Sequence, residues 1–367
     1  MTRMGAAGVR PLHEGDLAAL AALRFRCFQR SRHGQPTAVE RMFRTAFLDH
    51  PWKALGVTSL VYENGHGEVV GFRGLVGRPL RYRGEPLIAA VSSQFMVEPG
   101  ARGQGVALAL MRATLDGPQD LVFADRVNPT ARQLWRLLRA TEVVELSLQW
   151  TRPLQPMRWQ AGLLGSARRT KWLRRLALPL LHGLDTAARR DANGPFGSAY
   201  GAASASLRDL SGAEHLELLT AFTGGYELVP AYDEHTLDWT MNLLEAGLGP
   251  NERLHRQGVY DAAGAPCGFF VAILDDSVAT VVQLGATRAG LASTLDGLVR
   301  FASAARCVEI RGRVQPEQWS ALARSPVGVS IGDARFMVVS RRPDVIEAIR
   351  SGRAWLSRLD GEWGLGF

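Results

Sequence analysis

The chain is poor in lysine and in cysteine. Lys53 and Lys171 are its only lysines, so arginine supplies nearly all of the 43 basic residues. The three cysteines, Cys27, Cys267 and Cys307, lie far apart and form no CxxC pair. An odd number of scattered cysteines argues against a disulfide framework and a cysteine-based metal site, so we expect free thiols and no metal.

Long apolar runs are absent too. No window approaches about 18 uninterrupted apolar residues, so the sequence predicts no membrane-spanning helix. Residues Met1–Arg10 lack the apolar core of a signal peptide. We therefore expect a cytoplasmic protein.

What is present is globular material with a basic balance. The 367 residues exceed one typical domain, and 46% of them are hydrophobic, which is enough for two cores. The 43 basic residues outnumber the 35 acidic ones, for a formal charge of +8. Such a charge favours anionic partners: nucleotide phosphates, nucleic acid, an acidic carrier protein or an anionic membrane.

Residues 1–152 have the pattern of a mixed α/β domain, because the apolar period changes repeatedly between that of a strand and that of a helix. The predicted elements are, in order, a strand at 9–12, helices at 17–28 and 39–48, strands at 59–63, 69–76 and 87–97, a helix at 105–115, a strand at 121–124, a helix at 130–138 and a strand at 143–150.

The rest of the chain divides where its composition changes. Residues 153–206 hold a basic amphipathic segment, 159–190, and then a stretch rich in glycine, alanine and serine that is typical of a linker. Over 207–367 the order of elements repeats that of the first domain, ending on a strand at 336–339. The fold class expected is α/β (α+β), with two domains that each hold a mixed, mostly antiparallel sheet flanked by helices.

The most informative segment is Val97–Ala107, where a strand passes through a glycine-rich turn into a helix. Gly103 and Gly105 let the main chain approach a ligand closely. Successive N–H groups in such a turn, together with the helix dipole, bind a pyrophosphate, and Arg102 adds a charged contact. No Gly-Lys-Ser/Thr follows and no GxGxxG register is present, so this is neither a Walker loop nor a dinucleotide fingerprint.

This segment resembles motif A of the GNAT acetyltransferase superfamily, Arg/Gln-x-x-Gly-x-Gly/Ala. Arg102, Gly105 and Ala107 match it, after a Val-x-Pro lead-in matched by Val97 and Pro99. The resemblance covers residues 9 to about 150 and extends to the second half only in the order of elements.

A second match is to motif B of the same superfamily, roughly Asn-x-x-Ala-x-x-x-Tyr. Asn128 and Ala131 match it, and Trp135 stands at the tyrosine position. The family often uses that tyrosine as the acid for the leaving thiolate, and an indole has no acidic proton to give. The thiolate would then leave with the help of water or of a helix dipole.

The resemblance implies a splayed sheet that holds acyl-CoA between the strand ending at Val97 and the strand ending near Asp125. The pantetheine arm is expected to pair with main chain around Met96 and Val97. The pyrophosphate is expected on the turn, and Asn128 on the arm. The predicted acyl-CoA-binding residues are Met96, Val97, Arg102, Gly103, Gln104, Gly105, Val106, Ala107 and Asn128.

Direct attack of an acceptor amine or hydroxyl on the thioester needs a base. Asp125 and Glu98 are the candidates, because they stand at the ends of the two splayed strands; the alternative for each is a solvated carboxylate. His50 is a candidate acceptor-site residue or a capping histidine. Ser92 and Gln94, which alternate onto one face of their strand, are candidates to orient a substrate or are ordinary strand residues.

The second half lacks the motif A spacing in the matching stretch, 283–291, so we expect it to shape the acceptor cleft without binding CoA. A polar and aromatic cluster between Tyr226 and Trp239 is a candidate acceptor surface or a helix-entry loop. Residues 159–190 have four interpretations: a segment on an anionic membrane, a dock for acyl-carrier protein, a nucleic-acid site that lacks the expected aromatics, or a solvated inter-domain helix.

The function predicted is transfer of an acyl group, taken to be acetyl, from acyl-CoA to an amine of a small-molecule or sugar-like acceptor. One alternative is a non-catalytic acyl-CoA-binding or regulatory module. Another is an acyltransferase that uses acyl-carrier protein and a lipid or polysaccharide precursor.

Overall fold

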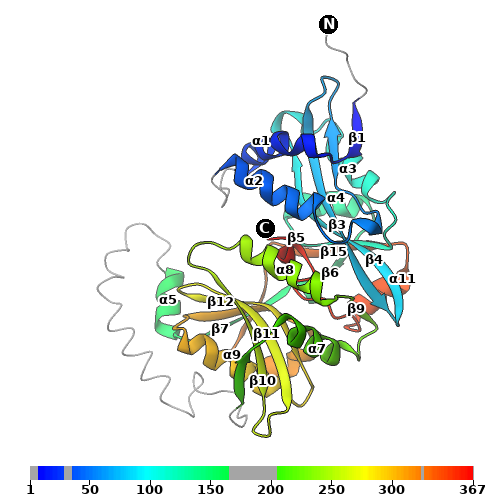
Figure 1. The fold of residues 1–367 in the computed structure, drawn as a ribbon. Coiled ribbons are helices and arrows are strands. Elements are labelled where there is room, and N and C mark those ends of the chain that lie inside the picture. Colours follow the sequence, from blue (N-terminus) through cyan, green and yellow to red (C-terminus); the bar gives the residue numbers. More distant parts are fainter. Residues whose placement is uncertain (1–6, 29–34, 165–204, 324–325, 367) are drawn as a thin grey trace. The chain divides into compact units, whose positions relative to one another are not determined.

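The computed structural model describes residues 7–28, 35–164, 205–323 and 326–366 (Figure 1). The chain forms two compact units, and neither is continuous in sequence. Unit 1 comprises Met1–Val144, Tyr226–Gly249 and Asp333–Phe367. Unit 2 comprises Glu145–Gly225 and Pro250–Gly332.

Unit 1 is built on a mixed eight-stranded sheet in the order β1-β2-β3-β4-β5-β15-β6, with β9 paired to β3. Among these strands only β4 and β5 run parallel. The bounds are β1 (Gly8–Pro11), β2 (Leu60–Glu63), β3 (Val69–Tyr82), β4 (Glu85–Val97), β5 (Leu121–Val127), β6 (Thr141–Val143), β9 (Leu228–Pro230) and β15 (Arg335–Ser340).

The long hairpin of β3 and β4 is closed by Arg83 and Gly84. Their φ angles are 52° and 86°, as in a type I′ turn, whose twist matches that of the two strands. This hairpin lies in the middle of the sheet. It carries Arg73 on β3 and Ser93 and Met96 on β4.

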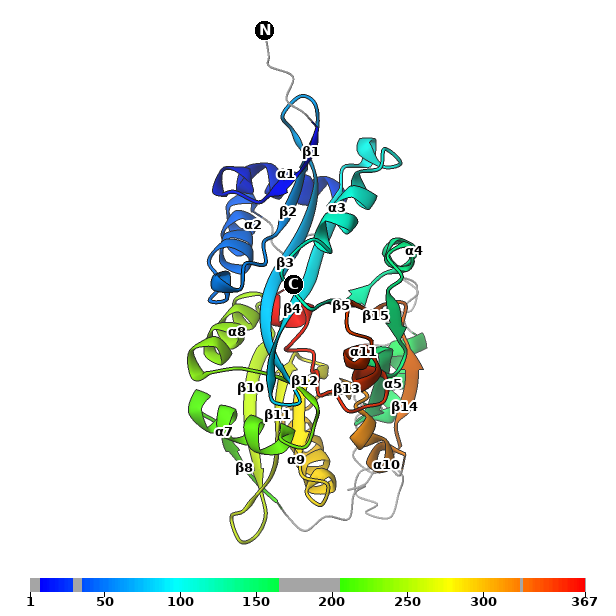
Figure 2. The same ribbon diagram turned by 90° about the vertical axis from the view of Figure 1, so that its right-hand side faces the viewer.

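Helices cover both faces of this sheet. Figure 2 shows α1 (Leu17–Cys27), α2 (Pro36–Phe43) and α8 (Glu234–Ala246) on one side of β3 and β4, and α3 (Val106–Thr114) and α4 (Pro129–Leu137) on the other. Short helical turns η1 (Glu14–Asp16), η2 (Arg44–Leu48), η3 (Lys53–Leu55), η4 (Pro99–Ala101) and η8 (Glu362–Leu365), and the helix α11 (Pro343–Arg350), complete the unit.

Two glycines of β3 show how closely these helices approach. A Cβ at Gly71 would overlap Val106 and Leu110 of α3, and a Cβ at Gly74 would overlap the ring of Phe47 on the opposite face. We call these the α3 face and the α1 face of the sheet. The core under the α3 face includes the buried Leu75, Ala90, Met111, Val122 and Trp135.

Unit 2 repeats this plan. Its seven-stranded sheet has the order β14-β7-β13-β12-β11-β10-β8, and β12 and β13 are its parallel pair in the described part. The strands are β7 (Leu148–Pro153), β8 (Ser206–Asp209), β10 (Arg253–Tyr260), β11 (Pro266–Leu274), β12 (Val278–Ala286), β13 (Glu309–Arg313) and β14 (Gly328–Ile331). The helical elements are η5 (Glu145–Ser147), α5 (Pro156–Leu164), α7 (Gly212–Thr223), α9 (Leu291–Ala304), η7 (Pro316–Gln318) and α10 (Trp319–Leu322).

Each sheet is completed by a strand from the other half of the sequence. β15 pairs with β5 and β6 in unit 1, where Figure 1 draws it in orange beside β5. β7 pairs with β13 and β14 in unit 2. The units therefore differ from the predicted ranges 1–152 and 207–367, because 145–152 joins the second sheet while 226–249 and 333–367 join the first.

The mixed α/β class with two helix-flanked sheets is confirmed. The run predicted as one strand at 143–150 is two strands, β6 and β7, separated by the turn Glu145–Ser147. Residues 165–204, with most of the basic segment 159–190 and the expected linker, lie outside the described residues. Where helices are described, none has both the length and the apolar character to cross a bilayer.

Candidate functional site

The parallel strands β4 and β5 separate part of the way along. They pair only where Ala89–Val91 faces Leu121–Phe123, although β4 continues to Val97 and β5 to Val127. Past this point no described strand lies beside the edge of β4 that faces β5. An extended chain with amide groups can pair with such an edge as an added strand.

A β-bulge lies in β4 where the strands separate. Phe72 of β3 pairs with Met96 and Gly74 pairs with Ser93, so two steps along β3 match three along β4. Gln94 takes a φ of 50°, which is uncommon for a residue with a side chain, and its amide oxygen accepts a hydrogen bond from Arg24. Bulges re-aim the strand and occur often next to active sites. The bulge also ends the alternation on which the prediction for Ser92 and Gln94 relied.

The turn after β4 presents open main chain at the start of α3. Gly103 and Gly105 have φ angles of 82° and 81°, which only glycine adopts readily. A Cβ at either position would meet nothing within 4 Å, so the space in front of the turn is open. The first N–H groups of α3 have no acceptor within the helix, and Gly105 provides no capping side chain.

The predicted acyl-CoA residues differ in exposure, and Val97 and Ala107 are half-buried. The side chains of Met96 and Val106 are buried in the core, so these residues are placed to contribute main chain only. The exposed members at the turn are Arg102, Gly103, Gln104 and Gly105. The side-chain amide of Gln104 donates to the carbonyl of Gly100 at 2.9 Å, which stiffens the turn.

Asn128 follows β5 and is exposed. Its side-chain oxygen accepts the N–H of Ala131 at 2.8 Å, so it caps the N-terminus of α4. This role alone accounts for an asparagine at the position. Contact of Asn128 with a pantetheine arm stays a prediction.

Trp135 packs inside the unit beside a buried cation. Its side chain is 2% exposed, and the guanidinium of Arg73 lies 5.0 Å from its ring and 5.2 Å from that of Phe95. Arg73 donates to the sulfur of Met111, while Nε and Nη2 have no partner among the described residues. Burial lowers the pKa of Arg73 to about 9, and the charge of Glu362 acts in the opposite direction. Arg73 is therefore a buried cation on the strand next to the diverging pair, and two of its nitrogens lack a partner in the described part of the chain.

The two carboxylates predicted as bases lie in different surroundings. Glu98, at the end of β4, forms an ion pair with the half-exposed Arg26. Asp125 on β5 is 8% exposed, and its carboxylate accepts the N–H of Glu362 at 2.9 Å. Gly361 is packed so closely that a Cβ there would overlap this carboxylate. Asp125 therefore anchors the C-terminal segment to β5.

The C-terminal turn η8, drawn in red in Figure 2, packs beside β4 and β5, and Glu362 is its first residue. Its carboxylate lies near the hydroxyl of Ser93 on β4 and the N–H of Arg126 on β5, and both of these dipoles favour its charged form. Protein surrounds the group closely, although part of the residue still reaches solvent. Burial, and after it the charge of Asp125, raises the pKa of Glu362 to about 7.

A second buried network fastens the same segment. Asp360 accepts hydrogen bonds from the hydroxyl of Tyr232 at 2.9 Å and from Ser357, and burial raises its pKa. Arg78 on β3 donates to Thr240 and to the carbonyl of Gly364. The tail before and after Glu362 is therefore held on the α1 face of the sheet.

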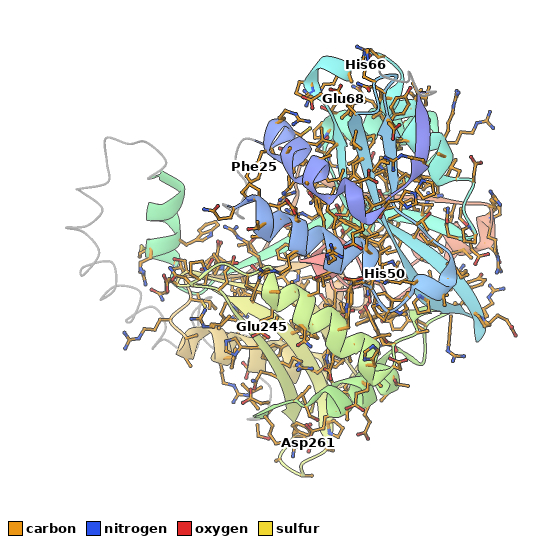
Figure 3. All side chains as sticks on the ribbon, turned by 45° about the horizontal axis from the view of Figure 1, so that its top comes forward. Phe25, His50, His66, Glu68, Glu245 and Asp261 are labelled. Atoms are coloured by element: carbon orange, nitrogen blue, oxygen red, sulfur yellow. The ribbon has the colours of Figure 1, made fainter. Side chains whose placement is uncertain are left out.

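His50 and the polar and aromatic cluster belong to this face too. His50, labelled in Figure 3, is 3% exposed, and burial followed by the charge of Arg78 lowers its pKa to about 4, so the ring is neutral. Trp52 packs edge-on against Trp239 of α8 at 5.3 Å. The cluster, predicted in the second half, thus lies in unit 1, and its Asp233 caps α8.

The matching turn in unit 2 is differently packed. At Gly290, before α9, a Cβ would overlap the carbonyl oxygen of Cys267 on β11, so no open space lies there. Further along, Gln283 of β12 is buried and bonded to His215 of α7 at 2.7 Å. This packing agrees with a CoA site in unit 1 alone, which remains a prediction.

Sequence reasoning missed Glu362, Ser93 and Arg73. An acid within Gly361-Glu362-Trp363-Gly364 stands out locally, but nothing in the sequence joins it to Asp125, which is 237 positions away. Arg73 is a charge inside a run of strand residues, which is the one local sign that it is unusual.

Comparison with solved structures agrees with this geometry. A probable N-acyltransferase from Enterococcus faecalis superposes with a TM-score of 0.59 at 11% identity, covering 92% of this chain and 72% of that one. A GCN5-related N-acetyltransferase from Kribbella flavida gives 0.55 at 15% identity, covering 91% and 71%. N-myristoyltransferase from Saccharomyces cerevisiae with bound myristoyl-CoA gives 0.50 at 12% identity, covering 91% and 82%.

In sequence the chain stands apart from these proteins. No family model matches it, and no curated protein matches it. Identities of 11–15% carry the fold and not the substrate. The chain therefore has the GNAT fold of the N-acyltransferases, with two such units in one polypeptide.

Proposed function

We propose that this protein is an acyltransferase that moves an acyl group from acyl-CoA to an amine of a small-molecule or sugar-like acceptor. The observation that carries the proposal is the separation of β4 from β5, which leads directly into an open, glycine-rich turn at the N-terminus of α3. The strand edge suits the amides of pantetheine, and the turn suits a pyrophosphate.

The reaction is direct transfer. The acceptor nitrogen forms a bond to the thioester carbonyl carbon, the C–S bond breaks, and the sulfur leaves with the bonding electrons. Trp135 has no proton to give to that sulfur, so negative charge develops on it. Arg73 is suited to stabilise that charge, because its buried guanidinium lies over this ring and its Nε and Nη2 donors have no partner among the described residues.

Asp125 and Glu98 have separate parts in this proposal. Asp125 holds the segment that carries Glu362, and Glu98 ties the end of β4 to Arg26 on α1. The bond to Arg26 makes Glu98 a poor base, because a base must be free to take up a proton.

Binding is tested first, by melting the protein with and without acetyl-CoA. A ligand present at about 100 times its Kd stabilises the folded state by about 2.7 kcal/mol, so the melting temperature should rise. Arg102→Ala should weaken this protection, since it removes a phosphate contact. Arg112→Ala, which changes an exposed arginine of α3 away from the turn, is the matched control. No protection by any acyl-CoA would refute the proposal.

Turnover is tested by thiol release from acetyl-CoA with a panel of amines. One structural feature favours the alternative of a binding or regulatory module: a tryptophan at the position where an acid is expected. Heat protection without thiol release on any amine would support that module. Longer acyl chains and acyl-carrier protein in the same assay test the remaining alternative.

A further inference from the structure

We propose that Glu362, delivered by the C-terminal segment, is the general base of the acyl transfer. The inference rests on the proposed function and assigns a residue to its proton-transfer step. The carboxylate takes the proton of the acceptor amine as the nitrogen bonds to the thioester carbon. The proton then passes to solvent or to the departing thiolate, so the products are the amide and the free thiol.

Position is the first argument. A base must lie within hydrogen-bond reach of the attacking nitrogen, and so beside the thioester. Glu362 begins η8, which contacts both β4 and β5, and its carboxylate feels the dipoles of Ser93 on β4 and of the Arg126 N–H on β5. The bulge at Gln94 begins one residue after Ser93. The carboxylate of Glu362 is thus carried by a turn that packs on both separating strands.

Positioning is the second argument. The main-chain N–H of Glu362 donates to Asp125 at 2.9 Å, and Gly361 admits Asp125 only because it has no Cβ. Trp363 receives the guanidinium groups of Arg126 and Arg358 on its ring, at 5.5 and 5.2 Å. Together with the Asp360 network, these contacts fix the residues on both sides of Glu362. Asp125 is thus a positioning residue.

The charged groups around Glu362 can be named from each neighbouring element. β5 contributes Asp125, which disfavours a second negative charge, and Arg126, which favours it. β3 contributes the buried Arg73. From β4 the contact is Ser93, and from α8 the residues that meet the turn are Thr240 and Leu243, none of which titrates. A carboxyl in this setting changes charge near neutral pH, where a base has both the free lone pair and the basicity it needs.

The test is the pH profile of kcat for wild type and Glu362→Gln. The acceptor should be a hydrazide, whose nitrogen is neutral over the range studied. Wild-type kcat should rise with pH, reach half of its maximum near pH 7 and level off about one pH unit higher. Glu362→Gln keeps the shape and loses the base, so kcat should fall by about 10² to 10⁴ and become nearly independent of pH. Heat protection by acetyl-CoA should be unchanged, which shows that the variant is folded.

Two further variants sharpen the result. Asp125→Asn keeps the oxygen that accepts from Glu362 and removes the neighbouring charge, so the profile should move to lower pH with activity retained. If Asp125 were itself the base, this variant would lose the rate instead. Glu347→Gln, an exposed carboxyl on α11, should match wild type.

The outcomes separate this inference from the proposed function. If wild type releases no thiol with any acceptor, the proposed function fails, and the base with it. If wild type turns over and Glu362→Gln has the same kcat and profile, the proposed function stands and Glu362 is not the base.

Discussion

The carboxyl of Glu362 should make the stability of unit 1 depend on pH in a way that a glutamine removes. Its pKa is about 7 in the folded protein, against the ordinary value of 4.5. The difference of about 2.5, at about 1.4 kcal/mol for each tenfold change, corresponds to about 3 kcal/mol. This is the free energy that the folded protein loses when it must hold the group charged.

The sign follows from the direction of the shift. A carboxyl whose pKa is raised by folding stabilises the protein while it is protonated. That stability is fully present below about pH 4.5 and is lost as the pH rises through about 7. Relative to Glu362→Gln, wild type should therefore become less stable by about 3 kcal/mol over this interval.

The assay is thermal melting of the two proteins, side by side, at pH values across that interval. For a domain of this size each kcal/mol moves the melting temperature by about 2–4 °C, so the gap should widen by roughly 6–12 °C. Glu347→Gln should show a constant gap to wild type. Parallel curves for wild type and Glu362→Gln would refute the reasoning, because they would mean that Glu362 is not desolvated in the folded protein.

Three further substitutions test the surroundings of the site. Arg73→Met should leave the melting temperature equal or higher, because a buried cation without an ionic partner costs stability, and it should lower kcat at least about tenfold. A large drop in melting temperature would instead show that Arg73 has a structural role. Asn128→Ala should lower the free energy of unfolding by about 1 kcal/mol because the helix cap is lost, whereas Asn128→Ser should keep the cap. A raised KM for acetyl-CoA in the serine variant would show that the asparagine amide also contacts the ligand. Gly361→Ala should lower the free energy of unfolding by about 1–3 kcal/mol and reduce kcat, while heat protection by acetyl-CoA is retained. Adding Asp125→Ala to this variant should recover part of the lost stability, which a double-mutant cycle would measure.

The two units differ in how the turn before the matching helix is packed. The space at Gly103 and Gly105 is open, whereas Gly290 lies against the main chain of Cys267. If the first turn binds the pyrophosphate as we propose, the close contact at Gly290 leaves no such space in the second unit.

Part of this protein could be predicted from short stretches of sequence. The end of the strand, the turn and the start of the helix all lie within Val97–Ala107. Glycine at positions 103 and 105 by itself indicates a backbone with positive φ. The capping role of Asn128 is equally local, since its partner Ala131 is three residues away. The mixed sheet with flanking helices follows from apolar periodicity, which acts over single elements.

Tertiary structure decided the rest, because the deciding contacts are not local. The sequences of β7 and β15 each predict a strand but do not say which sheet that strand joins. β7 pairs with β13 of unit 2 and β15 with β5 of unit 1, and those sheet edges exist only in the folded protein. In the sequence, nothing distinguishes Glu362 from other acidic residues. Only in the folded protein does its N–H donate to Asp125 and does its turn pack on β4 and β5. Its burial, and hence its altered basicity, comes from neighbours that the linear order does not bring together.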